Sequence, residues 1–173
     1  RLEVHLPEVD ALIAVLVENG VTLVTTPSGG AKADFSRRAR SVFAPHMLEA
    51  FNRVDVGRGV RSEIHNPLLT LRFKEEARKF EQRFVEAGGR LLMGANAMYL
   101  PIIPGVANHD VMVELADWFE PLDVIRMATG DAAITLGLGN ETGRVAPGLH
   151  ADLLVVEGKP DVDLRDIRRV KQV

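Results

Sequence analysis

Two short apolar segments, each preceded by a helix-forming stretch that ends in glycine, constrain the fold of this chain most. Residues 21–26 are rich in β-branched side chains and too few for a helix, which indicates a strand buried on both faces of a sheet. Residues 90–93 follow Gly88 and Gly89 and indicate a second buried strand. Because strands that alternate with helices pair in parallel through right-handed crossovers, the sequence predicts an α/β fold.

The helices are predicted from the spacing of apolar residues. Pro7 opens the first, and Asn19 with Gly20 ends it, after an apolar run at residues 2–6 that indicates another strand. The second should pack through a stripe of Phe and Ala, with its charged residues on the other side. The two apolar stripes comprise Val9, Leu12, Ile13, Leu16 and Val17, and Phe73, Ala77, Phe80 and Phe84.

The rest of the chain divides into a loop, a helical part and a tail. Residues 31–71 are predicted to be an elaborated loop, either a surface excursion or a segment that gates a substrate. Three short helices follow between residues 110 and 136, and Asp131 is expected to cap the third. After Gly143 the pattern indicates a β-rich tail in which residues 153–156 are buried.

Composition excludes several classes of partner and site. The formal net charge of −3 provides no positive field for nucleic acid or anionic lipid, so neither is expected to bind. The absence of cysteine excludes disulfides and thiolate metal ligands. No apolar stretch approaches the ~20 residues of a membrane span, and we expect a cytoplasmic protein. The first residue is Arg rather than Met, from which we expect a fragment of a longer protein.

Two motifs in the second half carry a resemblance to a known family. They read ATGDAAITLGL at residues 128–138 and GRVAPGLHADLLVV at residues 143–156. In this order and spacing they resemble the C-terminal part of the amidohydrolase superfamily, close to its imidazolonepropionase-like and adenine deaminase-like branch. Weaker agreement extends over residues 21–26 and 73–97, so the resemblance covers most of the chain apart from residues 31–71.

The resemblance implies an architecture. Residues 1–138 would form the C-terminal portion of a TIM-like (β/α)8 barrel with its following helices. Residues 21–26 and 91–95 would be the seventh and eighth strands of that barrel. Residues 139–173 would be the C-terminal share of a flanking β-sandwich. Catalytic groups in such barrels lie at the carboxyl ends of the strands.

The resemblance also implies a chemistry: hydrolysis of a C–N bond in a non-peptide amide, a cyclic amide or a dipeptide by a metal-activated water. The cofactor would be a divalent metal, with zinc expected. Asn96 stands at the catalytic position where the family has an aspartate that acts as base, since this chain reads GANA at residues 94–97 where relatives commonly read GTDA. Asn has neither the charge nor the proton affinity for that role, which places the activity of this chain in doubt.

Each of the other candidate site residues could instead have an ordinary structural role. His5 would be a metal ligand or a loop histidine, and Thr26 and His109 would be substrate-binding residues at the barrel mouth or ordinary strand-end and helix residues. No two of the five histidines are closer than 19 positions in the sequence, so this chain alone does not assemble the family's metal site.

The sequence therefore leaves three hypotheses for the function. The first is a fragment of a metal-dependent amidohydrolase that acts on a small-molecule substrate. The second is a non-catalytic barrel protein of amidohydrolase descent that binds or assembles, and the third is a self-sufficient α/β domain of unrelated function. Each hypothesis is compatible with a homo-oligomer.

Overall fold

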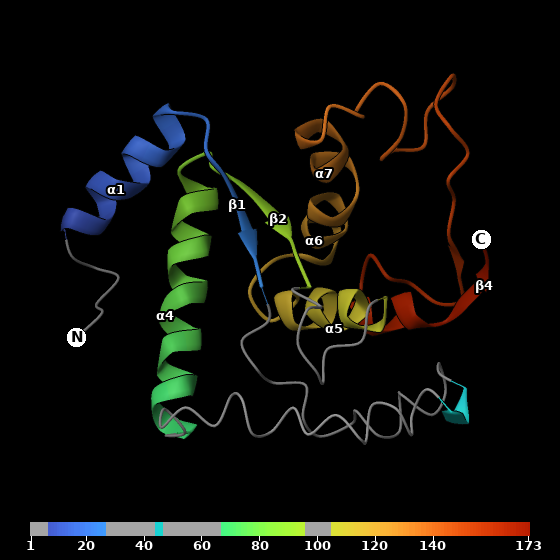
Figure 1. Ribbon diagram of the computed structural model, residues 1–173, viewed down its shortest axis with the longest axis horizontal. Helices are drawn as coiled ribbons and strands as arrows, with labels where there is room; N and C mark the ends of the chain where they lie inside the picture. Colours follow the sequence, from blue (N-terminus) through green and yellow to red (C-terminus); the bar gives the residue numbers. More distant parts are fainter. Residues whose placement is uncertain (1–6, 27–43, 47–66, 96–104) are drawn as a thin grey trace.

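The computed structural model describes residues 7–26, 44–46, 67–95 and 105–173. In that part of the chain, a pair of strands alternates with helices before three shorter helices and a tail (Figure 1). The elements are α1 (Pro7–Glu18), β1 (Thr22–Thr25), α4 (Pro67–Glu86), β2 (Arg90–Met93), α5 (Val106–Leu115), α6 (Pro121–Ala128), α7 (Gly130–Thr135), β3 (Val155–Val156), the 3-10 helix η2 (Leu164–Arg168) and β4 (Val170–Gln172). No described helix is both long and apolar enough to cross a bilayer. This content confirms the α/β class.

The two central strands pair in parallel, as predicted. Thr22 of β1 is opposite Arg90 of β2, and Thr25 is opposite Met93. One further hydrogen bond, from the amide of Gly94 to the carbonyl of Thr25 at 2.8 Å, extends the ladder past the end of β2. The expectation that β1 is buried on both faces is wrong. Successive side chains point to opposite faces, and Thr25 is 2% exposed whereas Val24 is 57% exposed.

Helix α4 is longer than predicted and packs through a different face. It begins at Pro67, inside the segment predicted to be loop, because proline is well placed in a first helical turn and the leucines that follow favour a helix. Ala77 of the predicted stripe is exposed, whereas Arg78 beside it is 2% exposed and Phe84 is fully buried. The predicted apolar stripe is therefore only partly correct, since a charged residue occupies the middle of the buried face.

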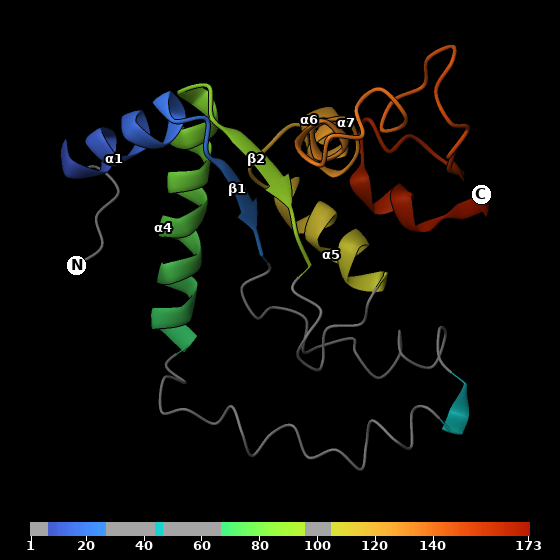
Figure 2. The ribbon, with the colours of Figure 1, turned by 45° about the horizontal axis from the view of Figure 1, so that its top comes forward.

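Helix α1 lies beside α4, on the far side from α5, α6 and α7 (Figures 1 and 2). Its predicted bounds are confirmed, but only Ile13 of its apolar stripe is fully buried and Leu12 is 49% exposed. An ion pair between Arg83 of α4 and Asp10 of α1 joins the two helices. The stripe is thus only partly used for packing in the described part of the chain.

The largest apolar core lies between α5, α6 and η2. Its members come from both the helical part and the tail, and they are 0 to 6% exposed: Val111, Met112, Leu115, Val124 and Leu164. Met93 of β2 packs against this cluster and connects it to the sheet. The predicted helix from residue 110 begins four residues earlier, at Val106, and the predicted start of α6 at Pro121 is confirmed. Asp131 lies in the first turn of α7 rather than at its cap, which is Thr129.

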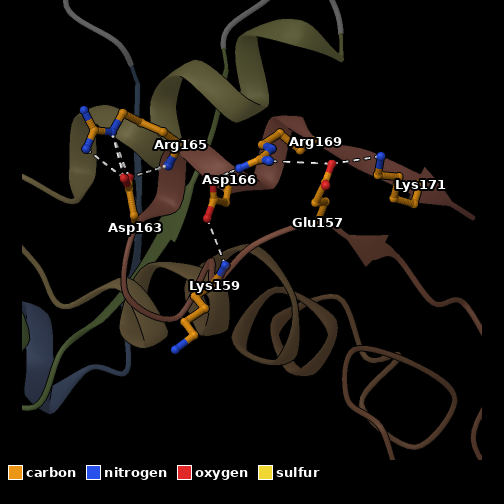
Figure 3. Close-up of polar contacts among 7 residues, drawn as sticks. All are labelled: Glu157, Lys159, Asp163, Arg165, Asp166, Arg169 and Lys171. Atoms are coloured by element: carbon orange, nitrogen blue, oxygen red, sulfur yellow. Dashed lines mark hydrogen bonds and ion pairs between the residues drawn. The ribbon is translucent and has the colours of Figure 1, made fainter.

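The tail contains a short two-stranded sheet and a row of exposed charged contacts. Strands β3 and β4 pair in antiparallel fashion. The expected burial of residues 153–156 is wrong, because Leu153, Leu154 and Val155 are 46 to 53% exposed. A row of ion pairs and hydrogen bonds runs instead along η2 and into β4 (Figure 3): Asp163 with Arg165, Asp166 with Arg169 and with the amide of Lys159, and Glu157 with Arg169 and Lys171.

Candidate active site

The structure describes two of the four residues that the sequence predicts for the site. Thr26 directly follows β1 and His109 lies in α5. Asn96 and His5, the predicted catalytic and metal-binding residues, lie outside the described residues. Figure 1 shows α5 near the ends toward which both strands run, which is the edge where a parallel α/β sheet carries its site.

Thr26 is presented at the end of β1 by the alternation of the strand. The side chain of Thr25 is buried on the face that α4 covers, and the neighbouring side chain of Thr26 is exposed. Its hydroxyl can donate one hydrogen bond and accept others. This geometry is compatible with the predicted contact to a substrate.

His109 lies half-buried on α5, beside the contact of this helix with η2. Burial lowers the pKa of His109 below its ordinary value of 6.5, the positive charge of Arg168 lowers it further, and the carboxylate of Asp110 offsets part of the change. Arg168 itself donates to Asp110 at 2.7 Å. His109 is therefore mainly neutral at pH 7, the state in which one imidazole nitrogen can accept a proton or a hydrogen bond.

A buried ionic network that the sequence analysis did not identify lies behind the strand ends. Arg78 donates through Nη1 to the hydroxyl of Thr25 and to Glu81, and through Nη2 to Oε1 of Glu114 at 2.9 Å. Lys74 contributes a second cation, 3.0 Å from the same oxygen of Glu114. Although burial alone would lower the pKa of Arg78, its bonds with Glu114 and Glu81 raise it, so the guanidinium stays charged. We call these five residues the Arg78 network.

One sequence signal for the network exists. Lys74, Arg78 and Glu81 recur at i, i+4 and i+7, which places them on one face of a helix. A stripe of charges is usually a solvated face, so the spacing alone does not reveal that this face is buried. The partner on α5, Glu114, lies 36 positions along the chain from Arg78, and no local pattern connects the two.

A hollow among the described residues lies away from these groups. It has a volume of about 430 Å³ and lies between the end of α4 and the connection from α5 to α6. Four of its nine lining residues are acidic, Trp118 and Phe119 are among the others, and neither Thr26 nor His109 is included. The candidate site residues therefore lie at the strand ends and on α5, outside this hollow.

A metal centre does not form from the described residues. Among them, no group of three or more His, Asp or Glu side chains is placed to hold a metal ion. His109 has one carboxylate beside it, that of Asp110, and this carboxylate is already bound by Arg168. The described part of the chain therefore does not fit a metal by itself.

The second half of the chain is similar to a known protein family. A sequence profile of the amidohydrolase family matches residues 106–173, which comprise α5, α6, α7 and the tail. Over residues 106–173 the chain is therefore similar to the amidohydrolase family. This match contains both motifs from which the resemblance was predicted, and it includes His109. A search of curated proteins finds no match to this chain.

Solved structures give the fold of this chain a wider context. It resembles the crystal structure of an amidohydrolase, with a TM-score of 0.57 and 20% identity over 93% of this chain and 34% of the other. It also resembles a prolidase complexed with N-methylphosphonate-L-proline, with a TM-score of 0.59 and 20% identity over 94% of this chain and 35% of the prolidase. For a Xaa-Pro dipeptidase with bound methionine in the active site, the TM-score is 0.52 and the identity 18%, over 94% of this chain and 45% of the dipeptidase. The chain thus shares their fold and spans a third to less than half of their length.

Proposed function

We propose that this chain is the C-terminal part of a hydrolase that cleaves C–N bonds. The observation that carries the proposal is the match of residues 106–173 to the amidohydrolase family. The fold of the chain, shared with an amidohydrolase and two proline-specific peptidases, supports it. The proposal concerns the whole protein, because the chain corresponds to a minor share of each of those structures.

The proposed architecture follows the sequence analysis. Residues 1–138 would belong to a TIM-like barrel, of which β1 and β2 are two neighbouring strands, and residues 139–173 to a flanking β-sandwich. The parallel pairing of β1 with β2 supports the first part. The antiparallel pairing of β3 with β4 is compatible with the second. Leu164 packs among residues of α5 and α6, so the two parts would share a core rather than be joined by a flexible linker.

The proposed substrate is a small molecule with an amide bond, and the first compounds to test are Xaa-Pro dipeptides. Two of the structures that share the fold are named as a prolidase and a Xaa-Pro dipeptidase, which favours dipeptides over cyclic amides as a starting point. We propose a cytoplasmic location, which gives access to such metabolites, and leave the oligomeric state open.

Each candidate residue has a proposed role. The hydroxyl of Thr26 and the neutral imidazole of His109 would contact the substrate at the carboxyl ends of the strands. Asn96 would occupy the position of the base, and His5 would contribute to a metal site completed by residues outside this chain. A divalent metal, with zinc expected, would supply the activation of water that the family generally uses.

A second candidate function is non-catalytic binding by the same scaffold. The observation that favours it is Asn96, because an amide side chain neither carries the charge nor accepts the proton that the family's aspartate does. In this case the protein would retain the pocket and bind a dipeptide or related amide without cleaving it.

The experiment uses the natural-length protein that contains this chain. It is incubated with Xaa-Pro dipeptides, N-acyl amino acids and a cyclic amide, with added zinc or with a chelator, and the products are separated by liquid chromatography. Release of free proline or amine that the chelator suppresses supports the hydrolase. If no C–N bond is cleaved while calorimetry detects binding of an intact dipeptide, the non-catalytic function is supported instead.

A further inference from the structure

The Arg78 network joins the described elements that carry the candidate substrate residues. Arg78 belongs to α4, and its guanidinium reaches the hydroxyl of Thr25 at the end of β1 and the carboxylate of Glu114 on α5. Thr25 is the neighbour of Thr26, and Glu114 lies on the same helix as His109. One buried side chain therefore connects the two parts of the proposed substrate pocket.

The backbone at Thr25 is held from two directions. Its carbonyl accepts the amide of Gly94, which ties the end of β1 to the end of β2, and its side chain accepts a hydrogen bond from Arg78. A Cβ at Gly94 would lie 2.6 Å from Cγ1 of Val24, so the two strand ends approach closely only because residue 94 is glycine. Fixing Thr25 in this way also fixes the direction in which Thr26 points.

Stability alone is a weak reason for an arginine at this place. A buried ion pair contributes little net stability, since desolvation cancels much of the attraction, and an apolar side chain of similar volume often serves as well. Nε of Arg78 is moreover buried and has no hydrogen-bond partner among the residues that the structure describes, which adds a cost. What an apolar residue does not provide is two directed contacts, one to β1 and one to α5.

We propose that Arg78 is a positioning residue, which sets the placement of Thr26 relative to His109 through its contacts with Thr25 and Glu114. This inference rests on the proposed function where it calls Thr26 and His109 pocket residues. Arg78 itself is buried behind the sheet and would not touch the substrate.

The test measures the placement directly and needs no turnover. The 173 residues contain no cysteine, so T26C and H109C introduce single attachment points for nitroxide labels within them. Pulsed electron paramagnetic resonance then gives the distribution of distances between the labels in the natural-length protein. We expect a narrow distribution with Arg78, and a broadened or shifted one in Arg78→Gln.

Matched variants separate positioning from a general loss of structure. Thr25→Val removes the hydroxyl at nearly constant volume and should broaden the distribution, whereas Thr25→Ser keeps the hydroxyl and should preserve it. Arg83→Gln makes the same substitution on α4 at an arginine that pairs with Asp10 of α1, and should leave the distribution unchanged. Should Arg78→Gln fail to fold, the two Thr25 variants still decide the matter.

Two results would overturn the inference. One is an unchanged distance distribution in folded Arg78→Gln or Thr25→Val. The other is equal broadening in Arg83→Gln or Thr25→Ser, which would indicate loosening of the fold. If the protein hydrolyses a dipeptide, Thr25→Val should lower kcat/KM by roughly 10- to 100-fold, mainly through KM, and Thr25→Ser should restore it. Absence of hydrolysis would contradict the proposed function while leaving the distance measurement intact.

Discussion

Arg168 of η2 donates to the carboxylate of Asp110 on α5 across 2.7 Å, and this contact joins residues 58 positions apart in the sequence. It connects the tail to the helix that carries His109. Because the guanidinium also lies near the imidazole, it disfavours the protonated form of His109, in addition to the effect of burial on the pKa. The contact between tail and helix should therefore depend on pH.

The first prediction concerns that dependence. His109 has a pKa near 6.5 when unfolded and a lower pKa when folded, so between the two values the unfolded state binds more protons. The free energy of unfolding is then highest above pH 6.5 and falls as the pH decreases toward the folded pKa. Urea unfolding at pH 7.5 and at pH 5.5 should show this loss, and it should be smaller in His109→Gln. An identical pH dependence in the two proteins would contradict the assignment.

The second prediction concerns Gly143, at the start of the second family motif. Its φ of 95° is unfavourable for other residues, and an added Cβ would lie 2.5 Å from the Cβ of Ala133 and 3.1 Å from the carbonyl of Thr129. Gly148, with φ of 87° and open space around it, is the control. Chemical denaturation should show a loss of about 1 kcal/mol for Gly148→Ala from backbone strain. In Gly143→Ala, overpacking should increase this loss of stability by about 1 to 3 kcal/mol. Equal losses of stability in the two variants would refute the close approach at Gly143.

The third prediction tests the core that the tail shares with the helices. Leu164 is 1% exposed and packs in the cluster of α5 and α6, so Leu164→Ala should lower the free energy of unfolding by about 2 to 5 kcal/mol. Val162, two residues earlier and 69% exposed, provides the control, and Val162→Ala should change stability by less than about 0.5 kcal/mol. Similar effects in both variants would mean that the tail does not dock through Leu164.

The fourth prediction concerns the charges of η2. Hydrogen bonds from the side chain and the amide of Arg165 lower the pKa of Asp163 to about 2. Because the pKa is lower in the folded protein, the contact stabilises the folded state at pH values above the unfolded pKa of about 4. This stabilisation is lost as the pH falls through about 2. A titration of the Asp163 carboxyl carbon by NMR should have its midpoint near 2 and should shift upward in Arg165→Gln. A wild-type midpoint near 4 would exclude the contact in solution.

Local signals predicted the order of elements better than their packed faces. The two strands, their parallel pairing and the glycine-terminated helices followed from β-branched runs and from residues such as Gly20 and Gly88, whose positive φ permits the helix ends. These features depend on neighbours in the sequence, so the sequence could predict them.

The buried face of α4 could not be predicted in this way. Apolar spacing favoured Ala77, but the structure buries Arg78, because Glu114 and Thr25 supply partners from other elements. A buried charge becomes acceptable only through such tertiary contacts. The same limit applies to the site, since Thr26 and His109 were predicted from the family resemblance and the residues that hold them were found only in the structure.

The similarity of residues 106–173 to the amidohydrolase family makes one substitution especially informative. In the natural-length protein with zinc present, Asn96→Asp restores the carboxylate that relatives carry, and Asn96→Ala serves as its control. We predict that Asn96→Asp raises kcat/KM for Xaa-Pro dipeptide hydrolysis by at least about 100-fold over the wild type, the usual contribution of a placed base, while Asn96→Ala does not. If all three proteins leave every amide substrate uncleaved, the chain does not belong to a C–N hydrolase.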